Sequence, residues 1–322
     1  MENMIEDWGS LEKDARVQLL KDVDATINTG IGVIDDFIRG IRPTDFFVIA
    51  ADTGLGKTTL MRLIATSLAE HGQKTLFISL ESYRGEMQDR QRHAEIMRLL
   101  PPTKRVSYAI WLDNPRQVPN EITEAAKQAS KDKYDGVLDM IYRTESFGIL
   151  ETIQAINLAA AQGYKAVVLD HLHYLDSDGR DNELQHIEKL ARAINRAVNI
   201  ARIPVIAASH LRKRGVGQKK SPIVPSIHDL HGSSEIAKRA TVILTVSRAR
   251  VESPSYSLAP TWFRVQKRRV GGIDDTLALA LFNRHDAKYE RLYKLYEISD
   301  DRTTAEPMRK LPDWARRENL VL

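Results

Sequence analysis

The stretch FFVIAADTGLGKTT, residues 46–59, decides the fold class of this 322-residue chain. A short run of apolar, β-forming residues leads into a loop with two glycines. An amphipathic segment from Lys57 to His71 follows, and Gly72 closes it. A strand, a glycine-containing loop and a helix in this order form the first part of a βαβ unit. The stretch therefore predicts an α/β fold built on a parallel sheet.

The alternation of strand and helix patterns continues along the chain. We expect strands in TLFISLE, LDMIY, KAVVLD and IPVIAAS, and helices up to about residue 100, near 149–162 and near 182–201. Prolines and a charged, helix-like piece in residues 101–136 indicate an insertion. The runs TVILTVS, TWFRVQK, TLALALF and YERLYKLYE follow a short helical SEIAKRA and have hardly any helix between them. We therefore expect a mostly parallel sheet with helices on both faces and antiparallel C-terminal additions.

The domain organisation predicted from these patterns is one large domain with two short extensions. Residues 1–25 carry alternating charge and a weak helical stripe, which predicts an arm or linker helix. Residues 26–298 form the large domain, a length that is ordinary for a single α/β unit. Residues 299–322 are expected to be a tail that covers this domain.

The composition excludes several classes of protein. With 43% hydrophobic and 28% charged residues the chain is typical of soluble globular proteins. The absence of cysteine excludes a disulfide framework and a thiolate zinc site. The sequence has no signal-like N-terminus and no apolar run of membrane-spanning length, so we expect a cytoplasmic protein, in a bacterial cytosol or an infected cell. The 47 basic and 43 acidic residues nearly balance, so local charge must identify the partner.

The loop after the first strand has the pattern of a phosphate-binding loop. Its backbone N–H groups and the N-terminus of the next helix form a concavity for anions, Lys57 neutralises phosphate charge, and Thr58 offers a hydroxyl to Mg²⁺. We expect ATP or another nucleoside triphosphate with Mg²⁺. The expected nucleotide-binding residues are Asp52, Thr53, Gly54, Leu55, Gly56, Lys57, Thr58 and Thr59. Ala51 replaces the first glycine of the usual GxxxxGK[ST] pattern, a small change, and the alternative is a glycine turn with a fortuitous lysine.

Two carboxylates follow apolar runs that we expect to end at the same edge of the sheet. Asp170 ends the run AVVLD and is expected to hold Mg²⁺ together with Thr58. Glu81 ends TLFISLE and is expected to activate the water that attacks the γ-phosphate. The alternative for each is an ordinary acidic residue at a strand end. His171 and His173 could form a metal pair, but the sequence offers no third ligand.

The segment between His210 and Asp229 is basic and has no acidic residue. Its cationic residues are Arg212, Lys213, Arg214, Lys219 and Lys220. We expect this loop to contact the phosphates of single-stranded nucleic acid. It contains no aromatic residue, which predicts contact with the backbone rather than base stacking, and little sequence preference. A solvated loop without a ligand is the alternative.

Together these segments resemble the RecA-like motor domain of DnaB-type replicative helicases, including the helicase halves of phage primase-helicases. The resemblance covers roughly residues 26–296, and its segments occur in the family's order: Asn28–Gly30, the alanine-initiated loop, Ser79–Glu81, Leu169–Leu172, Ala208–Leu211, Asp229–Ser233 and Lys267–Arg269. It implies a RecA-like P-loop NTPase core and an ATP-dependent DNA helicase of DNA replication. It also implies a homo-oligomeric, hexameric ring that moves on single-stranded DNA in the 5′ to 3′ direction.

The resemblance also implies roles for single residues. His210 looks like the family's sensor of the γ-phosphate. Lys267 and Arg269 look like the residues that reach the neighbouring subunit's γ-phosphate as a trans finger, with Arg268 as a bystander. The family's DNA-contacting loops fall on the basic segment and on His231, Gly232 and Ser233.

The chain departs from full-length relatives because it shows no N-terminal collar domain and no fused primase. We therefore expect either a compact phage- or plasmid-type helicase or a motor that relies on a separate partner, such as a primase or loader. Two other functions stay open, a filament-forming RecA- or RadA-like recombination ATPase and a nucleotide-switched DNA-binding scaffold that does not translocate. Strand-exchange assays separate the first, while Glu81 argues against the second, since a switch that never hydrolyses nucleotide does not need it.

Overall fold

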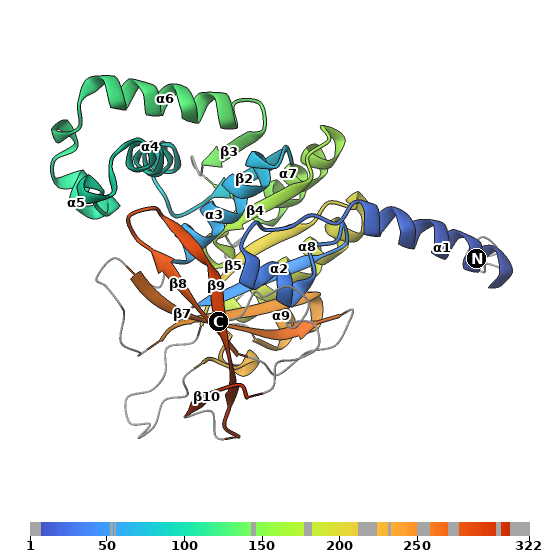
Figure 1. Ribbon diagram of the computed structural model, residues 1–322. Coiled ribbons are helices and arrows are strands. Elements are labelled where there is room, and N and C mark those ends of the chain that lie inside the picture. The colour runs from blue at the N-terminus through green and yellow to red at the C-terminus, as the bar shows by residue number, and fades with distance from the viewer. Residues whose placement is uncertain are drawn as a thin grey trace.

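The computed structural model describes residues 8–51, 54, 56–142, 146–176, 182–211, 224–230, 233–249, 258–269, 277–300 and 304–309. In this part of the chain, ten strands form a single sheet in the order β10-β9-β8-β7-β6-β1-β5-β4-β2-β3 (Figure 1).

The strands are β1 (Phe46–Ala51), β2 (Thr75–Ser79), β3 (Leu138–Tyr142), β4 (Ala166–Asp170), β5 (Val205–His210), β6 (Val242–Arg248), β7 (Leu258–Arg268), β8 (Leu277–Asn283), β9 (Lys288–Ile298) and β10 (Ala305–Pro307). The helices are α1 (Trp8–Asp24), α2 (Gly32–Ile38), α3 (Lys57–Glu70), α4 (Glu86–Leu99), α5 (Tyr108–Asp113), α6 (Asn120–Tyr134), α7 (Ile149–Ala161), α8 (Glu183–Ala201) and α9 (Ser233–Arg239).

The sheet has a parallel half and an antiparallel half. Strands β6, β1, β5, β4, β2 and β3 run parallel to one another, whereas β7 to β10 are antiparallel to their neighbours. This confirms the predicted mostly parallel sheet with antiparallel C-terminal strands. One run was misassigned: TVILTVS forms β6, which pairs with β1 in parallel rather than joining the antiparallel additions. The connection from β5 to β6 includes α9 and returns the chain to the edge of the sheet at which the parallel strands begin. Strand β6 can therefore run in the same direction as β1.

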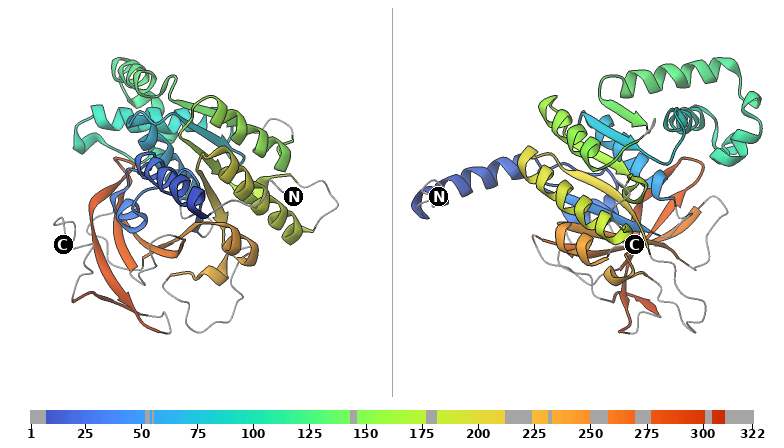
Figure 2. Two further views of the ribbon diagram at one scale, coloured as in Figure 1. Left: turned by 90° about the vertical axis from the view of Figure 1, so that its right-hand side faces the viewer. Right: turned by 180° about the vertical axis from the view of Figure 1, so that it is seen from behind.

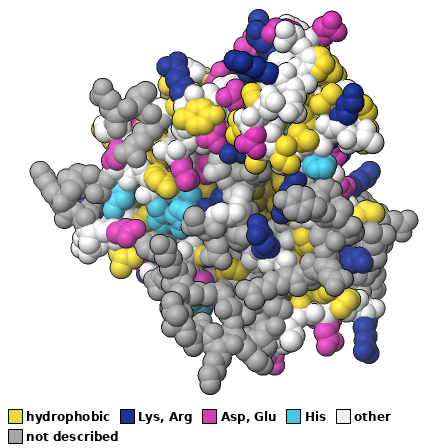
Figure 3. Space-filling view, turned by 90° about the vertical axis from the view of Figure 1, so that its left-hand side faces the viewer, with side chains coloured by type: hydrophobic (Ala, Val, Ile, Leu, Met, Phe, Trp, Pro, Cys, Tyr) yellow, Lys and Arg dark blue, Asp and Glu magenta, His cyan; other side chains and the backbone are white. Residues whose placement is uncertain are grey.

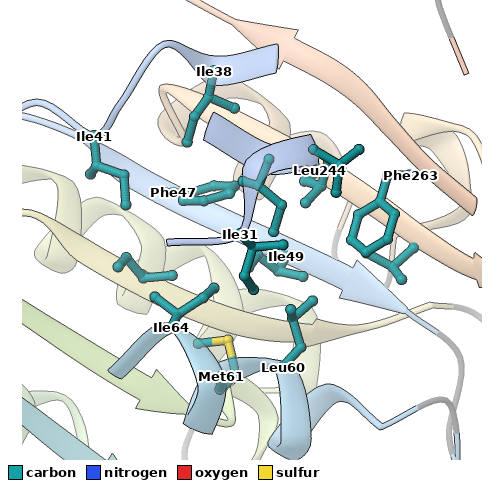
Figure 4. Close-up of a cluster of buried hydrophobic side chains, with 14 of the residues drawn as sticks. Ile31, Ile38, Ile41, Phe47, Ile49, Leu60, Met61, Ile64, Leu244 and Phe263 are labelled. Atoms are coloured by element: carbon teal, nitrogen blue, oxygen red, sulfur yellow. The ribbon is translucent and has the colours of Figure 1, made fainter. Parts of the chain in front are cut away.

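Strand β1 is buried on both faces and lies at the centre of the core. Phe47 and Ile49 pack against α2 and α3 on one face, while Phe46 and Val48 pack against α8 on the other. Figure 4 shows the first of these clusters, with side chains from β1, α2 and α3 in contact. A strand enclosed in this way is apolar at every position, which is why FFVIA shows no polar alternation. The predicted helices on both faces are therefore present.

The predicted insertion, residues 101–136, contributes α5 and α6 to a helical module beyond the β3 edge of the sheet, and α4 completes the module. Helices α4, α5 and α6 lie together there (Figures 1 and 2). They share a small core that includes Ile96, Trp111 and Ala126. The Arg105 guanidinium donates to the Asp286 carboxylate at 2.6 Å and thereby ties the module to the β8–β9 turn.

The two ends of the described chain leave the core in different ways. Helix α1 extends away from the domain (Figures 1 and 2), and its Val17, Leu19, Leu20 and Val23 are each more than half exposed. At the other end, β10 pairs with β9, so part of the expected tail joins the sheet. Among the described residues, no helix combines the length and hydropathy needed to cross a membrane.

The turn at Asn28–Gly30 positions α2 against α3. The Asp35 carboxylate accepts hydrogen bonds from the Thr29 amide at 2.7 Å, the Thr29 hydroxyl at 2.8 Å and the Gly30 amide at 2.9 Å. Gly30 has a φ of +74°, and a Cβ atom there would lie 1.6 Å from the Ser67 hydroxyl oxygen of α3. Both the left-handed backbone and the close approach therefore require glycine.

We expect Gly30→Ala to lower the free energy of unfolding by about 2–4 kcal/mol, because it adds a clash with α3 to the backbone strain. Urea unfolding measures this loss. Gly72→Ala is the matched control, since Gly72 has a similar φ of +71° but open space around it. Its expected loss is about 1 kcal/mol. Equal losses for the two variants would show that contact with α3 plays no part.

Candidate functional site

The predicted phosphate loop, both carboxylates and His210 meet at one edge of the sheet. In the parallel register, Ala51 lies beside His210 and Ser79 lies beside Asp170. The amide of Leu80 donates to the carbonyl of Asp170 at 2.8 Å, so the chain that leads to Glu81 is fixed to the end of β4. The ends of β1, β2, β4 and β5 therefore bring together groups that are far apart in the sequence.

Two glycines of the loop between β1 and α3 are described by the structure. Gly54 and Gly56 have φ values of +79° and +81°, in the left-handed region. Lys57 begins α3 and is buried, and its ammonium donates to the carbonyl of Ala51 at 3.0 Å. Thr58 and Thr59 follow in the first turn and are half-buried. Three predicted loop residues lie outside the described part of the chain, namely Asp52, Thr53 and Leu55.

Asp170 is a fully buried carboxylate at the end of β4. Neither of its oxygens makes a hydrogen bond of standard geometry with a described residue. Burial raises its pKa to about 6; the Thr58 hydroxyl and the Lys57 ammonium favour the ionised form, whereas the charge of Glu81 opposes it. Burying a carboxylate without partners is costly, so such a group is suited to binding a cation.

The ligand chemistry at Asp170 fits Mg²⁺. The groups that face one another are the carboxylate of Asp170 and the hydroxyl of Thr58, and hard cations prefer oxygen ligands of this kind. Within the described residues, no group of three or more histidine, aspartate and glutamate side chains could hold a metal by itself. Mg²⁺ typically takes only one or two protein ligands and completes its shell with phosphate oxygens and water.

Three histidines pack together beside Asp170. The ring centroids of His171 and His210 are 3.8 Å apart, and the ring of His173 lies 5.3 Å from His171 and 5.6 Å from His210. Burial, together with the neighbouring histidines, lowers the pKa of His171 to about 2, so its ring is neutral. Histidine side chains are visible as a group on the face shown in Figure 3, near acidic side chains. The end of β4 is thus packed directly against the end of β5.

Glu81 lies at this edge with an exposed side chain. The hydroxyl of Tyr174 donates to its carboxylate at 3.4 Å. Tyr174 belongs to the short 3-10 turn η4 (Leu172–Tyr174) that follows β4 directly. It was not among the predicted site residues, because a tyrosine after a strand gives no signal of its own in the sequence.

The predicted nucleic-acid loop leaves the sheet directly after His210. Its residues Arg212, Lys213, Arg214, Lys219 and Lys220 lie outside the described part of the chain, as do His231, Gly232 and the side chain of Ser233. The base of the loop is described: Leu211 pairs with Leu230 as an antiparallel bridge. The carbonyl of Pro225 accepts a hydrogen bond from Gln266 at 2.8 Å. Both ends of the loop are therefore held at the edge that carries His210.

The basic triplet at the end of β7 has three different surroundings. The ammonium of Lys267 donates to the carbonyl of Ala237 at 2.5 Å, near the C-terminus of α9. The guanidinium of Arg268 donates to the carbonyl of Phe37 at the end of α2. Arg269 is exposed. Arg268 therefore has a structural contact, and the exposed Arg269 is accessible to another molecule.

A cavity of about 160 Å³ lies beside the phosphate loop and was missed in the sequence. It is lined by Gly54, Gly56, Thr59, Val246, Ser247, Arg248, Ala259, Pro260, Thr261, Phe282, Arg284 and Tyr289. The aromatic rings of Phe282 and Tyr289 are in contact, with centroids 5.2 Å apart. Both residues lie in strands whose apolar pattern predicts only a place in the hydrophobic core. The charged turn between β8 and β9 is the one sequence signal that could have indicated a binding site near them.

Comparisons with known proteins identify the family and the fold of this chain. The profile of the family described as DnaB-like helicase C terminal domain matches residues 26–291. The replicative DNA helicase DnaB of Leifsonia xyli subsp. xyli (strain CTCB07) is 27% identical over 225 residues, which cover 69% of this chain and 46% of that protein. The chain spans about half the length of the curated relatives it matches.

Two solved structures share the fold. The one described as the ATPase Domain of G40P has a TM-score of 0.70 at 17% identity and covers 88% of this chain and 99% of its own. The other, described as a DnaB-like replicative helicase and its interactions with primase, has a TM-score of 0.70 at 16% identity and covers 88% and 67%. These likenesses confirm the predicted RecA-like α/β fold.

We expect Asp170→Asn to raise the free energy of unfolding at pH 8 by about 1–3 kcal/mol in the absence of nucleotide and Mg²⁺. Burial raises the pKa of Asp170 in the folded protein to about 6, well above the ordinary value of an aspartate, so the ionised carboxylate destabilises the fold above pH 6. That cost disappears as the pH falls toward 4, where the folded group is protonated. Denaturant unfolding at pH 8 and pH 4 measures both values.

The exposed carboxylate of Asp132 on α6 provides the control, because Asp132→Asn removes an equal charge without relieving burial. A loss of stability in Asp170→Asn at pH 8 would contradict the account of a carboxylate whose ionised form is destabilised by burial.

Proposed function

Because the chain belongs to the DnaB-like helicase C-terminal domain family, we propose that it is an ATP-driven motor that moves on single-stranded DNA and unwinds duplex DNA in replication. The observation that carries this proposal is the meeting of the phosphate loop, Asp170, Glu81 and His210 at one sheet edge. The loop that we expect to contact DNA leaves from the same edge. The proposed nucleotide site is therefore adjacent to the point at which the proposed DNA-contacting loop begins.

We assign the hydrolysis of ATP to side chains of this edge. Lys57 binds the β- and γ-phosphates, and Thr58 and Asp170 would hold Mg²⁺, which neutralises phosphate charge when bound. Glu81 accepts the proton of the attacking water, since its carboxylate is accessible and lies at the same strand ends. The remaining loop residues bind phosphate oxygens through their backbone amides.

The cavity beside the loop is our candidate for the nucleoside. It adjoins Gly54 and Gly56, which follow the bound phosphates, and it offers the aromatic rings of Phe282 and Tyr289 with the guanidinium of Arg284 nearby. Aromatic and guanidinium planes stack on nucleobases without selecting strongly among them. This composition favours a nucleotide pocket of modest base preference.

The coupling of nucleotide state to DNA is assigned to His210 and the segment after it. His210 lies beside the start of the phosphate loop, and Leu211 begins the loop that carries Arg212 to Lys220. A shift of His210 in response to the γ-phosphate would therefore move the base of the basic loop. His231, Gly232 and Ser233 follow the other end of the loop and are assigned to the same DNA contact.

We propose a hexameric ring in which Arg269 and Lys267 act on the neighbouring subunit's nucleotide. The exposure of Arg269 supports this role, whereas Lys267 would have to leave the carbonyl of Ala237. One matched structure is described with its interactions with primase, so we propose a separate primase as a partner. Translocation from 5′ to 3′ is proposed from family membership.

Steady-state ATP hydrolysis, measured with and without single-stranded DNA across protein concentration, tests this function. We expect DNA to stimulate hydrolysis and the rate per subunit to rise cooperatively with concentration, because the finger acts between subunits. Lys57→Ala should abolish the signal and so excludes a contaminating ATPase. A low rate of ATP hydrolysis that depends on neither DNA nor protein concentration would contradict the proposed motor function.

We expect the double substitution Lys219→Ala and Lys220→Ala to weaken binding of single-stranded DNA and to flatten its salt dependence. Each lost phosphate contact lowers the slope of log K against log salt by about 0.7. The control pair is Lys127→Ala and Lys131→Ala on α6, which removes equal charge from the helical module. An unchanged slope in the first pair, or equal losses in both pairs, would refute the loop as the DNA contact.

A further inference from the structure

Tyr174 lies between the two groups of the site that must respond to the γ-phosphate. Its hydroxyl donates to the Glu81 carboxylate at 3.4 Å. Its ring meets the ring of His171 edge-on, with centroids 5.7 Å apart, and lies 6.4 Å from the ring of His210. A continuous set of contacts therefore connects Glu81 with His210 through Tyr174 and His171.

The backbone around Tyr174 is fixed on both sides. Leu172 and Leu175 are buried in the core beneath the sheet edge. Asp176 accepts a hydrogen bond from the amide of Phe147 at 2.8 Å and pairs with Gly148 as a bridge. The tyrosine is therefore held on a rigid turn, whereas Glu81 is an exposed, long side chain with many accessible rotamers. Because the backbone at Tyr174 is fixed, a hydrogen bond from its hydroxyl restricts the rotamers that Glu81 can adopt.

The hydroxyl of Tyr174 remains a donor at neutral pH. Burial raises the pKa of Tyr174 above its ordinary value, and the negative charge of Glu81 raises it further. The hydroxyl therefore carries its proton at neutral pH. A hydroxyl donor and a carboxylate acceptor are complementary, so the two side chains are suited to a hydrogen bond at this position.

We propose that Tyr174 is a positioning residue for hydrolysis: its hydroxyl holds the Glu81 carboxylate in line with the attacking water, and its ring links that position to the His171–His210 stack. This inference rests on the proposed ATP hydrolysis. Correct placement of a general base accelerates the chemical step and leaves nucleotide binding unaffected. Tyr174 itself does not touch the reacting atoms.

The test is Tyr174→Phe, which removes one oxygen atom and keeps the ring against His171. We expect the kcat of DNA-stimulated ATP hydrolysis to fall about 3- to 10-fold, the size of effect expected when one positioning hydrogen bond is lost. The KM for ATP and the affinity for a non-hydrolysable ATP analogue should stay within about twofold. An unchanged or raised kcat, or a loss confined to KM, would overturn the proposal.

Tyr164→Phe is the matched control. It makes the same chemical change at a tyrosine whose hydroxyl donates to Asp139 at 2.5 Å, outside the site. We expect wild-type kcat and KM for this variant. A similar fall in kcat for both variants would show a general effect of removing a tyrosine hydroxyl and would overturn the assignment.

A double-mutant cycle tests whether Tyr174 acts through Glu81. Glu81→Asp shortens the side chain by one methylene and takes the carboxylate out of reach of the hydroxyl. In that background Tyr174→Phe should have no further effect on kcat. The same fold-loss in both backgrounds would overturn the proposal. If the wild-type protein hydrolyses ATP but Tyr174→Phe matches it, only this inference fails, whereas an inactive wild type refutes the proposed function and the inference together.

Discussion

The parallel register of four strands is the constraint on which the site depends. Backbone hydrogen bonds place Ala51 beside His210 and Ser79 beside Asp170, and they bind Leu80 to the end of β4. A shift of one strand by one residue would turn its side chains to the opposite face and separate these groups. The side chains of β1 are buried on both faces, so such a shift would also disrupt their packing in the core. Core packing therefore determines the geometry of the polar edge.

The polar edge is costly to fold. Asp170 is buried with oxygens that lack standard partners, and His171 is buried in its neutral form among two other histidines. Neither arrangement improves stability, and both lie where nucleotide phosphates and Mg²⁺ are proposed to bind. Bound ligands would compensate the buried carboxylate, which couples nucleotide binding to the stability of this edge. The surrounding sheet supplies the stability that the site lacks.

Much of the fold and part of the site could be predicted from the sequence. A strand that is buried on both faces is apolar at every position, as the run FFVIA is. A backbone with positive φ favours glycine, as at Gly54 and Gly56. The parallel direction of β6 could not be predicted, because direction depends on the path of the preceding crossover. Tyr174 and Tyr289 were missed for a related reason: their roles arise from tertiary contacts between segments distant in sequence.

We propose that two carboxylates at one sheet edge have different roles: Asp170 binds the metal ion and Glu81 activates the attacking water. The most direct test compares Mg²⁺-dependent ATP binding and hydrolysis in Glu81→Gln and Asp170→Asn. The account predicts that Glu81→Gln binds Mg²⁺-ATP as tightly as the wild type but hydrolyses it at least about 100-fold more slowly, whereas Asp170→Asn loses the part of the affinity that depends on Mg²⁺. Equal loss of binding in both variants, or normal hydrolysis by Glu81→Gln, would contradict it.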